Sequence, residues 1–204
     1  LPKADKAQLQ AQIDRANNSA DYIKADTAVA SALSAAKNVV AKPNPTPAEI
    51  SQATNDLKQA LDAAIAKETA AQAAARTAVD KAKNSKSPAD IRAAEALLVH
   101  VQDPAKKSAM QDELNAVKQE ITDARTALSK LIDKAKNTPT DGLAAETVAA
   151  LNTAIAAAKA VNNDQESTVA QLTEAKTKLQ SALDNLKTDK TALAKAIADA
   201  DQEP

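Results

Sequence analysis

Residues 75–84 read ARTAVDKAKN, and residues 128–137 read LSKLIDKAKN. Two more segments follow the same pattern, LQAQIDRANN at 9–18 and LAKAIADADQ at 193–202. The fifth residue of each segment is aliphatic and stands at position 13, 79, 132 or 197, so the spacings are 66, 53 and 65 residues. A segment that recurs at such periods is typical of a helical repeat array, in which one small unit is stacked several times along the chain.

The composition favours helices with small side chains. The 204 residues include one Tyr, no Phe and no Trp, and alanine makes up about a quarter of them. Leu, Ile and Val together stay below the share of roughly 20% that usually supports a core. The net charge of −1 nevertheless argues against disorder, and alanine is the best helix former. We therefore predict an all-α fold of thin bundles, each only modestly stable by itself.

Composition also excludes several classes of function. The absence of Cys excludes disulfides, thiolate catalysis and cysteine metal sites. Balanced charge argues against a nucleic-acid partner, which needs a basic face. No run approaches the roughly 20 apolar residues that cross a bilayer, so no membrane insertion is expected. The start, Leu1-Pro2-Lys3, carries no signal peptide, and we interpret it as an arbitrary cut in a longer protein.

Prolines mark the predicted helix boundaries. Pro43 and Pro45 forbid helix, whereas Thr46-Pro47-Ala48-Glu49 predicts a helix start with a Thr N-cap, Pro at the first helical position and Glu for a capping box. No stop signal follows until Asn84-Ser85. One helix of about 37 residues, roughly 55 Å long, is therefore expected to join the last helix of the first unit to the first helix of the second.

Other helices are read from their apolar stripes. Helices are expected over about 6–18 and 27–40, with a loop at 20–26 between them. Asp103-Pro104 starts a helix that reads on to Asn137 without a stop. The stripes predicted to face a core include Ile50, Ala53, Leu57, Leu61, Ala64 and Ile65 after Pro47, and Ile91, Ala94, Leu97, Leu98 and Val101 after Pro88.

These boundaries divide the chain into tandem three-helix modules. We predict modules at 1–68, 69–122 and 123–188, and the start of a truncated fourth repeat at 189–204. Because neighbouring modules would share long helices instead of flexible linkers, we expect a monomeric, elongated rod.

The first and third modules resemble the FIVAR modules of Gram-positive cell-surface proteins. The resemblance is carried by Tyr22 with ALSAAKNVV at 32–40 and ISQATNDLKQAL at 50–61, and by AIAAAKAV at 154–161 and LTEAKTKLQSAL at 172–183. The middle module, with ADIRAAEALLVHVQDPAKKSAMQDELNAV, is similar in size to the GA-type three-helix modules found beside FIVAR modules. The resemblance implies an extracellular, wall-attached protein whose modules are stalk or adhesive repeats.

Few residues suggest a site. His100 is the only histidine, and a metal site is not expected there because no other metal ligands cluster with it. We expect it at a helix C-terminus instead, a position that suits a cation. Tyr22 could be a recognition contact, but a lone aromatic residue at a bundle end more often closes the core.

Acidic pairs also have a simple interpretation. Asp199 with Asp201, and Asp112 with Glu113, invite comparison with glycosidase carboxylates, but no sugar-stacking cleft is evident, and we interpret both pairs as solvated helix faces. The alanine-rich run at 68–78 indicates close helix approach or an exposed connector. We therefore predict no catalytic, cofactor-binding or metal-binding residue, and any ligand-binding residue stays unknown.

The function that follows is non-enzymatic. We expect a stalk or adhesive repeat region that spaces an adhesive domain from the cell, through reach and stiffness. A first alternative is a binding module, in which a helical face grips a host extracellular protein or glycan weakly and repetition strengthens the binding. A second alternative is an intracellular helical scaffold, which a signal peptide upstream would exclude.

Overall fold

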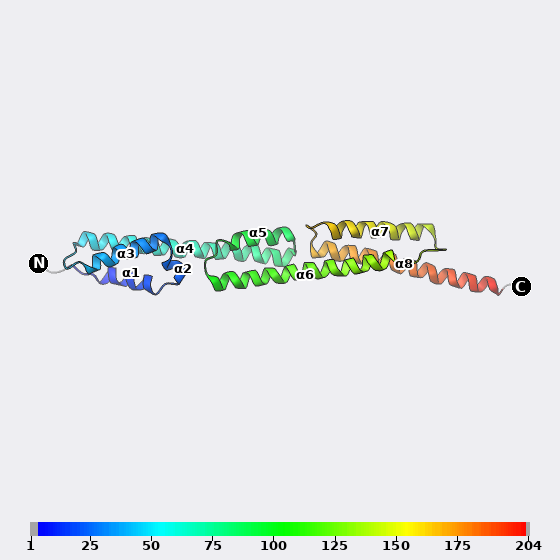
Figure 1. Cartoon of the computed structure of the whole chain (residues 1–204), viewed down its shortest axis with the longest axis horizontal. Coiled ribbons are helices and arrows are strands. Elements are labelled where there is room, and N and C mark those ends of the chain that lie inside the picture. The colour runs from blue at the N-terminus through cyan, green and yellow to red at the C-terminus, as the bar shows by residue number, and fades with distance from the viewer. Residues whose placement is uncertain (1–3, 203–204) are drawn as a thin grey trace. The chain divides into compact units, whose positions relative to one another are not determined.

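The computed structural model describes residues 4–202, and over that range the chain is all-α, which confirms the predicted fold class. No strand occurs among the described residues. The helices, shown in Figure 1, are α1 (Ala7–Asn17), α2 (Asp21–Lys24), α3 (Thr27–Ala41), α4 (Pro47–Ser85), α5 (Pro88–Leu98), α6 (Pro104–Lys136), α7 (Ala145–Asn163) and α8 (Val169–Asp201).

Two compact units make up the chain. Unit 1 comprises the residues up to Arg76 together with Ala96–Ala109. Unit 2 comprises Thr77–Glu95 and the residues from Met110 onward. The divisions fall inside α4, α5 and α6, so each of these helices contributes residues to both units.

The core of unit 1 lies between α1, α3 and the first part of α4. Leu9 of α1, Val29 of α3 and Leu57 and Leu61 of α4 are fully buried in one cluster. Apolar residues that recur every three or four positions place a single stripe of each helix against the others, as an amphipathic helix requires. Alanines at the remaining contact positions let the helices approach closely.

The predicted loop at 20–26 contains a helical turn, α2, so that prediction was wrong in part. Ile23 of this turn is only 6% exposed and packs into the core of unit 1. Four residues are too few to show helical periodicity, and burial of Ile23 supplies the stabilisation that the sequence does not reveal. Asp26 then caps α3, because its side chain accepts a hydrogen bond of 3.1 Å from the Val29 N–H.

Two capping boxes start equivalent helices in the two units. The Thr46 hydroxyl accepts from the Glu49 N–H at 3.1 Å, and the Thr46 N–H donates to the Glu49 carboxylate at 3.3 Å, which confirms the predicted box. At the start of α8, Thr168 and Gln171 make the same reciprocal pair at 2.9 and 3.2 Å. The Glu49 carboxylate also pairs with Lys42, and that hydrogen bond, followed by the one from Thr46, lowers the pKa of Glu49.

The two long helices continue as the sequence predicts. α4 runs unbroken for 39 residues and includes the alanine-rich stretch at 68–78, and α6 runs for 33 residues. α4 ends at Ser85, where the next residue, Lys86, adopts a left-handed conformation with φ of 49°. A left-handed residue is a common way to end a helix, although it is usually glycine.

Unit 2 repeats the three-helix packing with the second half of α6, α7 and the first part of α8 (Figure 1). The buried apolar residues of this packing include Leu128, Leu131, Ile132 and Ala135 of α6, Leu151, Ile155 and Ala158 of α7, and Leu172, Leu179, Leu183 and Leu186 of α8. Elsewhere in unit 2, ion pairs link neighbouring helices: Lys83 of α4 to Glu113 of α6 at 2.8 Å, and Glu95 of α5 to Lys118 of α6 at 2.9 Å.

Two residues expected in the core are exposed instead. The exposed fractions are 39% for Ile65 and 37% for Leu97. Their neighbours Ala64 and Leu98 are buried at 9% and 2%. Successive helical residues are rotated by about 100°, and with Ala64 and Leu98 turned into the core, Ile65 and Leu97 lie at its edge.

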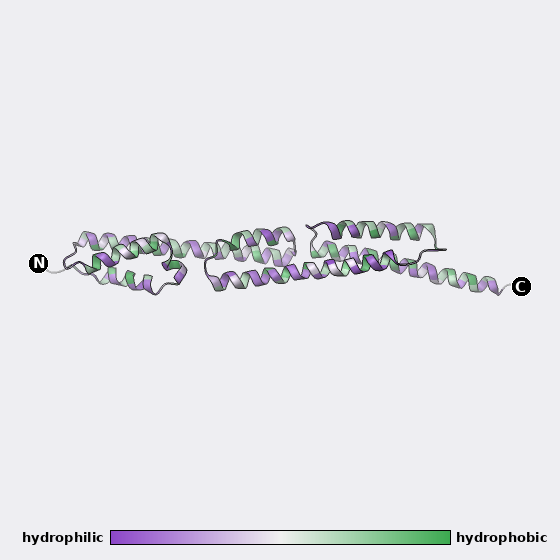
Figure 2. Cartoon of the chain, viewed as in Figure 1, coloured by the Kyte–Doolittle hydropathy of each residue, from purple (hydrophilic) through white to green (hydrophobic). Residues whose placement is uncertain are grey.

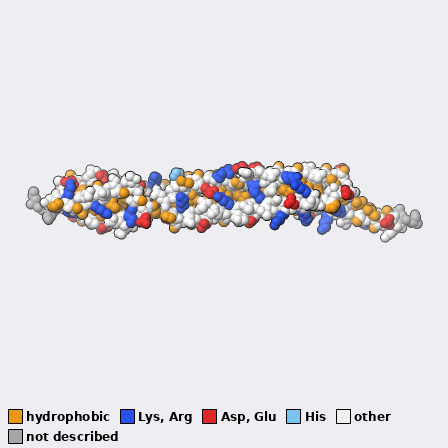
Figure 3. Space-filling model, in the orientation of Figure 1, with side chains coloured by type: hydrophobic (Ala, Val, Ile, Leu, Met, Phe, Trp, Pro, Cys, Tyr) orange, Lys and Arg blue, Asp and Glu red, His pale blue; other side chains and the backbone are white. Residues whose placement is uncertain are grey.

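The helices are amphipathic and their surfaces are of mixed charge. Figure 2 shows polar and apolar residues interspersed along the helices, and Figure 3 shows acidic and basic side chains interspersed on the face in view. Within residues 4–202, no helix combines the length and the hydropathy that a bilayer span requires.

Candidate functional site at the helix junctions

The first candidate site is a buried carboxylate on α4, in unit 1. Glu68 is only 6% exposed. Its carboxylate accepts hydrogen bonds from the backbone N–H groups of Gln102, at 3.0 and 3.1 Å, and Asp103, at 2.9 Å, and from the Gln72 side chain at 3.0 Å. The two backbone donors lie just before α6, where a helix start has unsatisfied N–H groups and positive dipole charge.

These contacts decide the ionisation of Glu68. Burial by itself raises the pKa of a carboxyl group, but the hydrogen bonds from Asp103, Gln72 and Gln102 outweigh it, and the pKa of Glu68 is lowered. The side chain is therefore held as a charged acceptor. It fastens the loop between α5 and α6 to the middle of α4.

Tyr22 also belongs to unit 1. Its ring is half-buried and packs against the core cluster formed by α1, α3 and α4, as the core-closing interpretation expects. Burial, followed by the negative charges of Asp103 and Glu68, raises the pKa of the Tyr22 hydroxyl above its ordinary value of 10.0. The charges of Asp103 and Glu68 therefore act on the Tyr22 hydroxyl.

The second candidate site lies in unit 2, where the loop between α7 and α8 meets the start of α5. The Val169 N–H donates to the Lys86 carbonyl at 3.3 Å, and the Arg92 guanidinium pairs with the Glu166 carboxylate at 2.8 Å. The ion pair raises the pKa of Arg92. Both partners of this pair are more than half exposed, so it contributes little to stability.

Arg125 of α6 makes the stronger contact at this site. Its guanidinium donates to the carbonyl of Asn162 at 2.6 Å and to that of Asp164 at 2.8 Å, at the C-terminus of α7. In unit 1, the Lys6 ammonium group donates to the carbonyls of Val40 and Lys42 at 2.8 and 2.9 Å, at the C-terminus of α3. A cationic side chain thus binds the C-terminal carbonyls of α3 in unit 1 and of α7 in unit 2.

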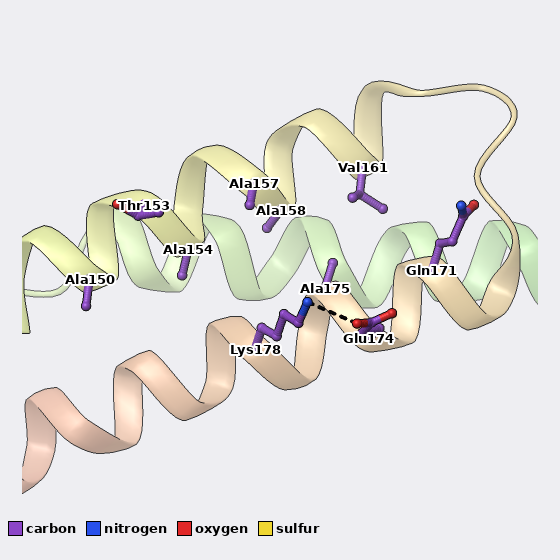
Figure 4. A pocket seen from close by; sticks show the side chains of 10 residues that line it. All are labelled: Ala150, Thr153, Ala154, Ala157, Ala158, Val161, Gln171, Glu174, Ala175 and Lys178. Carbon is purple, nitrogen blue, oxygen red and sulfur yellow. Dashed lines mark ion pairs between the residues drawn. The ribbon is translucent and has the colours of Figure 1, made fainter.

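A hollow of about 490 Å³ lies between α7 and α8 in unit 2. Figure 4 shows its wall of small side chains from α7, among them Ala150, Ala154 and Ala157, facing Ala175 and Lys178 of α8. Lys178 pairs with Glu174 at 3.0 Å, one turn away on the same helix. The hollow is mainly apolar, which suits an apolar side chain or the flat face of a ligand.

The residues singled out in the sequence do not converge. His100 is exposed in the turn after α5, where its N–H donates to the Leu97 carbonyl at 3.1 Å. Asp112, Asp199 and Asp201 are exposed, and Glu113 pairs with Lys83. Among the described residues, no group of three or more His, Asp or Glu could hold a metal ion.

Sequence reasoning missed Lys6, Glu68 and Arg125. One signal was present: Lys6 and Arg125 each stand seven residues before the isoleucine of the repeated segment, Ile13 and Ile132. No comparable signal marks Glu68, which stands in an alanine-rich run and binds a loop 34 and 35 residues away.

Comparison with known proteins gives one finding. The model of the FIVAR domain matches residues 5–64 and 124–187, which confirms the resemblance of the first and third modules. The matched ranges do not include 65–123, so the GA-like middle module and the module boundaries stay predictions. No curated protein and no solved structure matches the chain.

Proposed function

The chain belongs to the FIVAR family through two copies of that repeat, and we propose that it forms a non-enzymatic stalk in a bacterial cell-surface protein. FIVAR is a non-catalytic repeat domain that occurs in extracellular bacterial surface proteins. The stalk holds an adhesive region away from a Gram-positive cell wall, or contributes to adhesion itself. Wall attachment and adhesion are parts of the proposal.

The continuity of α4 and α6 carries this proposal. Each helix begins in one three-helix pattern of the sequence and ends in the next, without a flexible linker. A hinge inside such a helix must break consecutive backbone hydrogen bonds, so continuous helices are stiffer connectors than Gly- and Ser-rich linkers. Stiffness is the property that a spacer needs.

The junction contacts support the same function. If the loop before α6 moved away from α4, the Glu68 carboxylate would lose its hydrogen bonds from two backbone N–H groups. If the C-terminus of α7 moved away from α6, two backbone carbonyls would lose their hydrogen bonds from Arg125. Both losses cost free energy, because hydrogen bonds to charged groups contribute about 1.5–3 kcal/mol each. The contacts therefore oppose local bending of α4 and α6.

Small-angle scattering of the full chain tests the stalk. A compact globule of this length has a radius of gyration of about 17 Å. The stalk requires a monomer with a radius of gyration and maximum dimension well above those of such a globule. A monomer with a value near 17 Å contradicts the proposal, because the long helices would then have to break and fold back.

The hollow between α7 and α8 favours a second candidate, a module that binds a host extracellular protein or glycan. The two functions are separated by replacing Ala157, an exposed wall residue, with Arg. Adhesion of beads coated with the chain to host cells would fall if the hollow binds a ligand, and would stay unchanged for a spacer. Ala160→Arg, on an exposed position of α7 outside the hollow, is the matched control.

A further inference from the structure

Two lysines from different helices of unit 2 lie next to each other at one cavity. Lys136 is the last residue of α6 and Lys159 stands on α7, and both line a cavity of about 410 Å³. Contact with Lys136, followed by the positive charge of that side chain, lowers the pKa of Lys159 below its ordinary value of 10.5. The two ammonium groups are therefore close enough to repel each other.

No acidic side chain compensates this repulsion. Within residues 4–202, neither lysine makes an ion pair with an acidic side chain, and no Asp or Glu lines the cavity. Like charges that are held together without a counter-charge cost free energy, so an anion between them would be stabilised. Three other lysines of unit 2, by contrast, pair with an acidic residue of a neighbouring helix or loop: Lys83 with Glu113, Lys86 with Glu120 and Lys118 with Glu95.

The same cavity also offers neutral hydrogen-bond donors. The Thr140 hydroxyl and the Asn152 side-chain amide belong to residues that line it, and neither group makes a hydrogen bond in the part of the chain that the structure describes. The Thr138 hydroxyl differs, because it donates to the Lys134 carbonyl at 2.7 Å. Thr140 is half-buried, whereas Asn152 is exposed. Two cationic and two neutral donors thus line one cavity.

We propose that this cavity, the lysine-pair site, binds a divalent tetrahedral oxyanion: inorganic phosphate, sulfate, or the terminal phosphate of an organic monoester. The anion lies between the ammonium groups of Lys136 and Lys159 and accepts hydrogen bonds from both. Thr140 and Asn152 donate to its remaining oxygens. Two positive charges match a dianion, whereas a carboxylate would neutralise only one of them.

The two FIVAR repeats differ at this site. In the first repeat, Asn17 stands where Lys136 stands in the second, four residues after the isoleucine of the repeated segment. Lys37 stands where Lys159 stands, nine residues before the threonine of the capping box. The repeat therefore does not need two lysines here in order to fold, and Lys37 is a control for Lys159 within the same chain.

Titration of the full chain with sulfate and with inorganic phosphate tests the site. Lysine side-chain NMR signals are followed at constant ionic strength, with chloride as the reference anion, at about pH 8, where phosphate is a dianion. The signals of Lys136 and Lys159 should shift together and saturate in the millimolar range, because both side chains are exposed. Lys37 should not shift. The pKa of Lys159 should rise when sulfate is bound, because an anion stabilises the charged form.

Two variants separate the lysine pair from general surface charge. Lys136→Asn, which copies the residue of the first repeat, should weaken the binding of both anions at least about tenfold. It should also raise the pKa of Lys159 in chloride, because the repelling charge is gone. Lys134→Asn removes the same charge from an exposed position about 160° away around α6, and it should change neither quantity.

A third titration, with glycerol 3-phosphate, distinguishes the sources of the anion. Affinity equal to that of inorganic phosphate supports a site that receives the terminal phosphate of a larger molecule. Affinity at least about tenfold lower supports a site for the free ions.

Three results overturn the proposal. One is the absence of saturating shifts at Lys136 and Lys159, or shifts of equal size at Lys37 and Lys134, which would show only general attraction of anions. Another is acetate that binds as tightly as sulfate. The third is an unchanged pKa of Lys159 in Lys136→Asn, because the two ammonium groups would then not be neighbours. None of these results bears on the stalk function, which rests on α4 and α6.

Discussion

At the scale of single residues, helix ends in this chain depend on charged side chains. Gly142 is the only glycine, so most helices cannot end in the usual glycine motif. Lys6 and Arg125 instead donate to the last carbonyls of α3 and α7, and Glu68 accepts from the N–H groups before α6. Each contact joins segments that are 34 to 39 residues apart in the chain.

Arg125→Ala should loosen the C-terminus of α7. The substitution leaves the carbonyls of Asn162 and Asp164 without their donor, which should lower the local free energy of opening by about 1–3 kcal/mol. Amide exchange over 158–164 measures the effect. Arg92→Ala, in the exposed pair with Glu166, is the matched control and should change it by less than about 1 kcal/mol. Equal effects of the two variants would show that Arg125 acts only as a surface charge.

Glu68→Gln should change stability in a pH-dependent way. The folded-state pKa of Glu68 lies below its ordinary value of 4.5, so its charged form stabilises the fold fully above that value. This contribution is lost as the pH falls through the folded-state pKa. At pH 7 the variant should therefore be less stable by about 1–3 kcal/mol, and the difference should shrink towards pH 3.

Urea unfolding at the two pH values measures this difference. Glu174→Gln is the control, because Glu174 pairs with Lys178 on the same exposed helix face and its loss should cost less than about 0.5 kcal/mol. A Glu68→Gln difference that stays constant from pH 7 to pH 3 would mean that the charge of Glu68 plays no part in holding the loop.

At the scale of elements, the proposed stalk depends on the continuity of α4. Its stretch from 68 to 78 contains few large side chains, so backbone hydrogen bonds and alanine's intrinsic helix propensity maintain it. Ala74 is exposed, so a substitution there leaves the core contacts in place. This makes the continuity of the helix testable separately from the packing of either unit.

Ala74→Pro should break α4 in this stretch. Proline removes one backbone hydrogen bond and its ring clashes with the preceding turn, at a cost of about 3 kcal/mol or more. Amide exchange around 70–78 should accelerate, while exchange at Leu57 and Leu61 should stay slow. Ala74→Ser, which keeps the backbone N–H, is the control. Unchanged exchange around the proline would show that α4 contributes little stiffness at this point.

At the scale of the whole molecule, stiffness links the helices to the proposed stalk. If continuous helices set the reach of the chain, Ala74→Pro should lower the radius of gyration measured by scattering, whereas Ala74→Ser should not. If the proline variant kept the radius of gyration of the native chain, the reach of the chain would not depend on the continuity of α4.

The sequence by itself determined the all-α class, the helix starts at Thr46-Pro47 and Asp103-Pro104, and the unbroken course of α4 and α6. These features depend on local chemistry: proline restricts its own backbone, a threonine caps the next turn, and alanine favours helix wherever it stands. Only the tertiary structure decided that Ile65 and Leu97, unlike their predicted neighbours Ala64 and Leu98, turn away from the core. It also decided that Glu68 and Arg125 bind distant helix ends, because those partners become neighbours only when the helices pack.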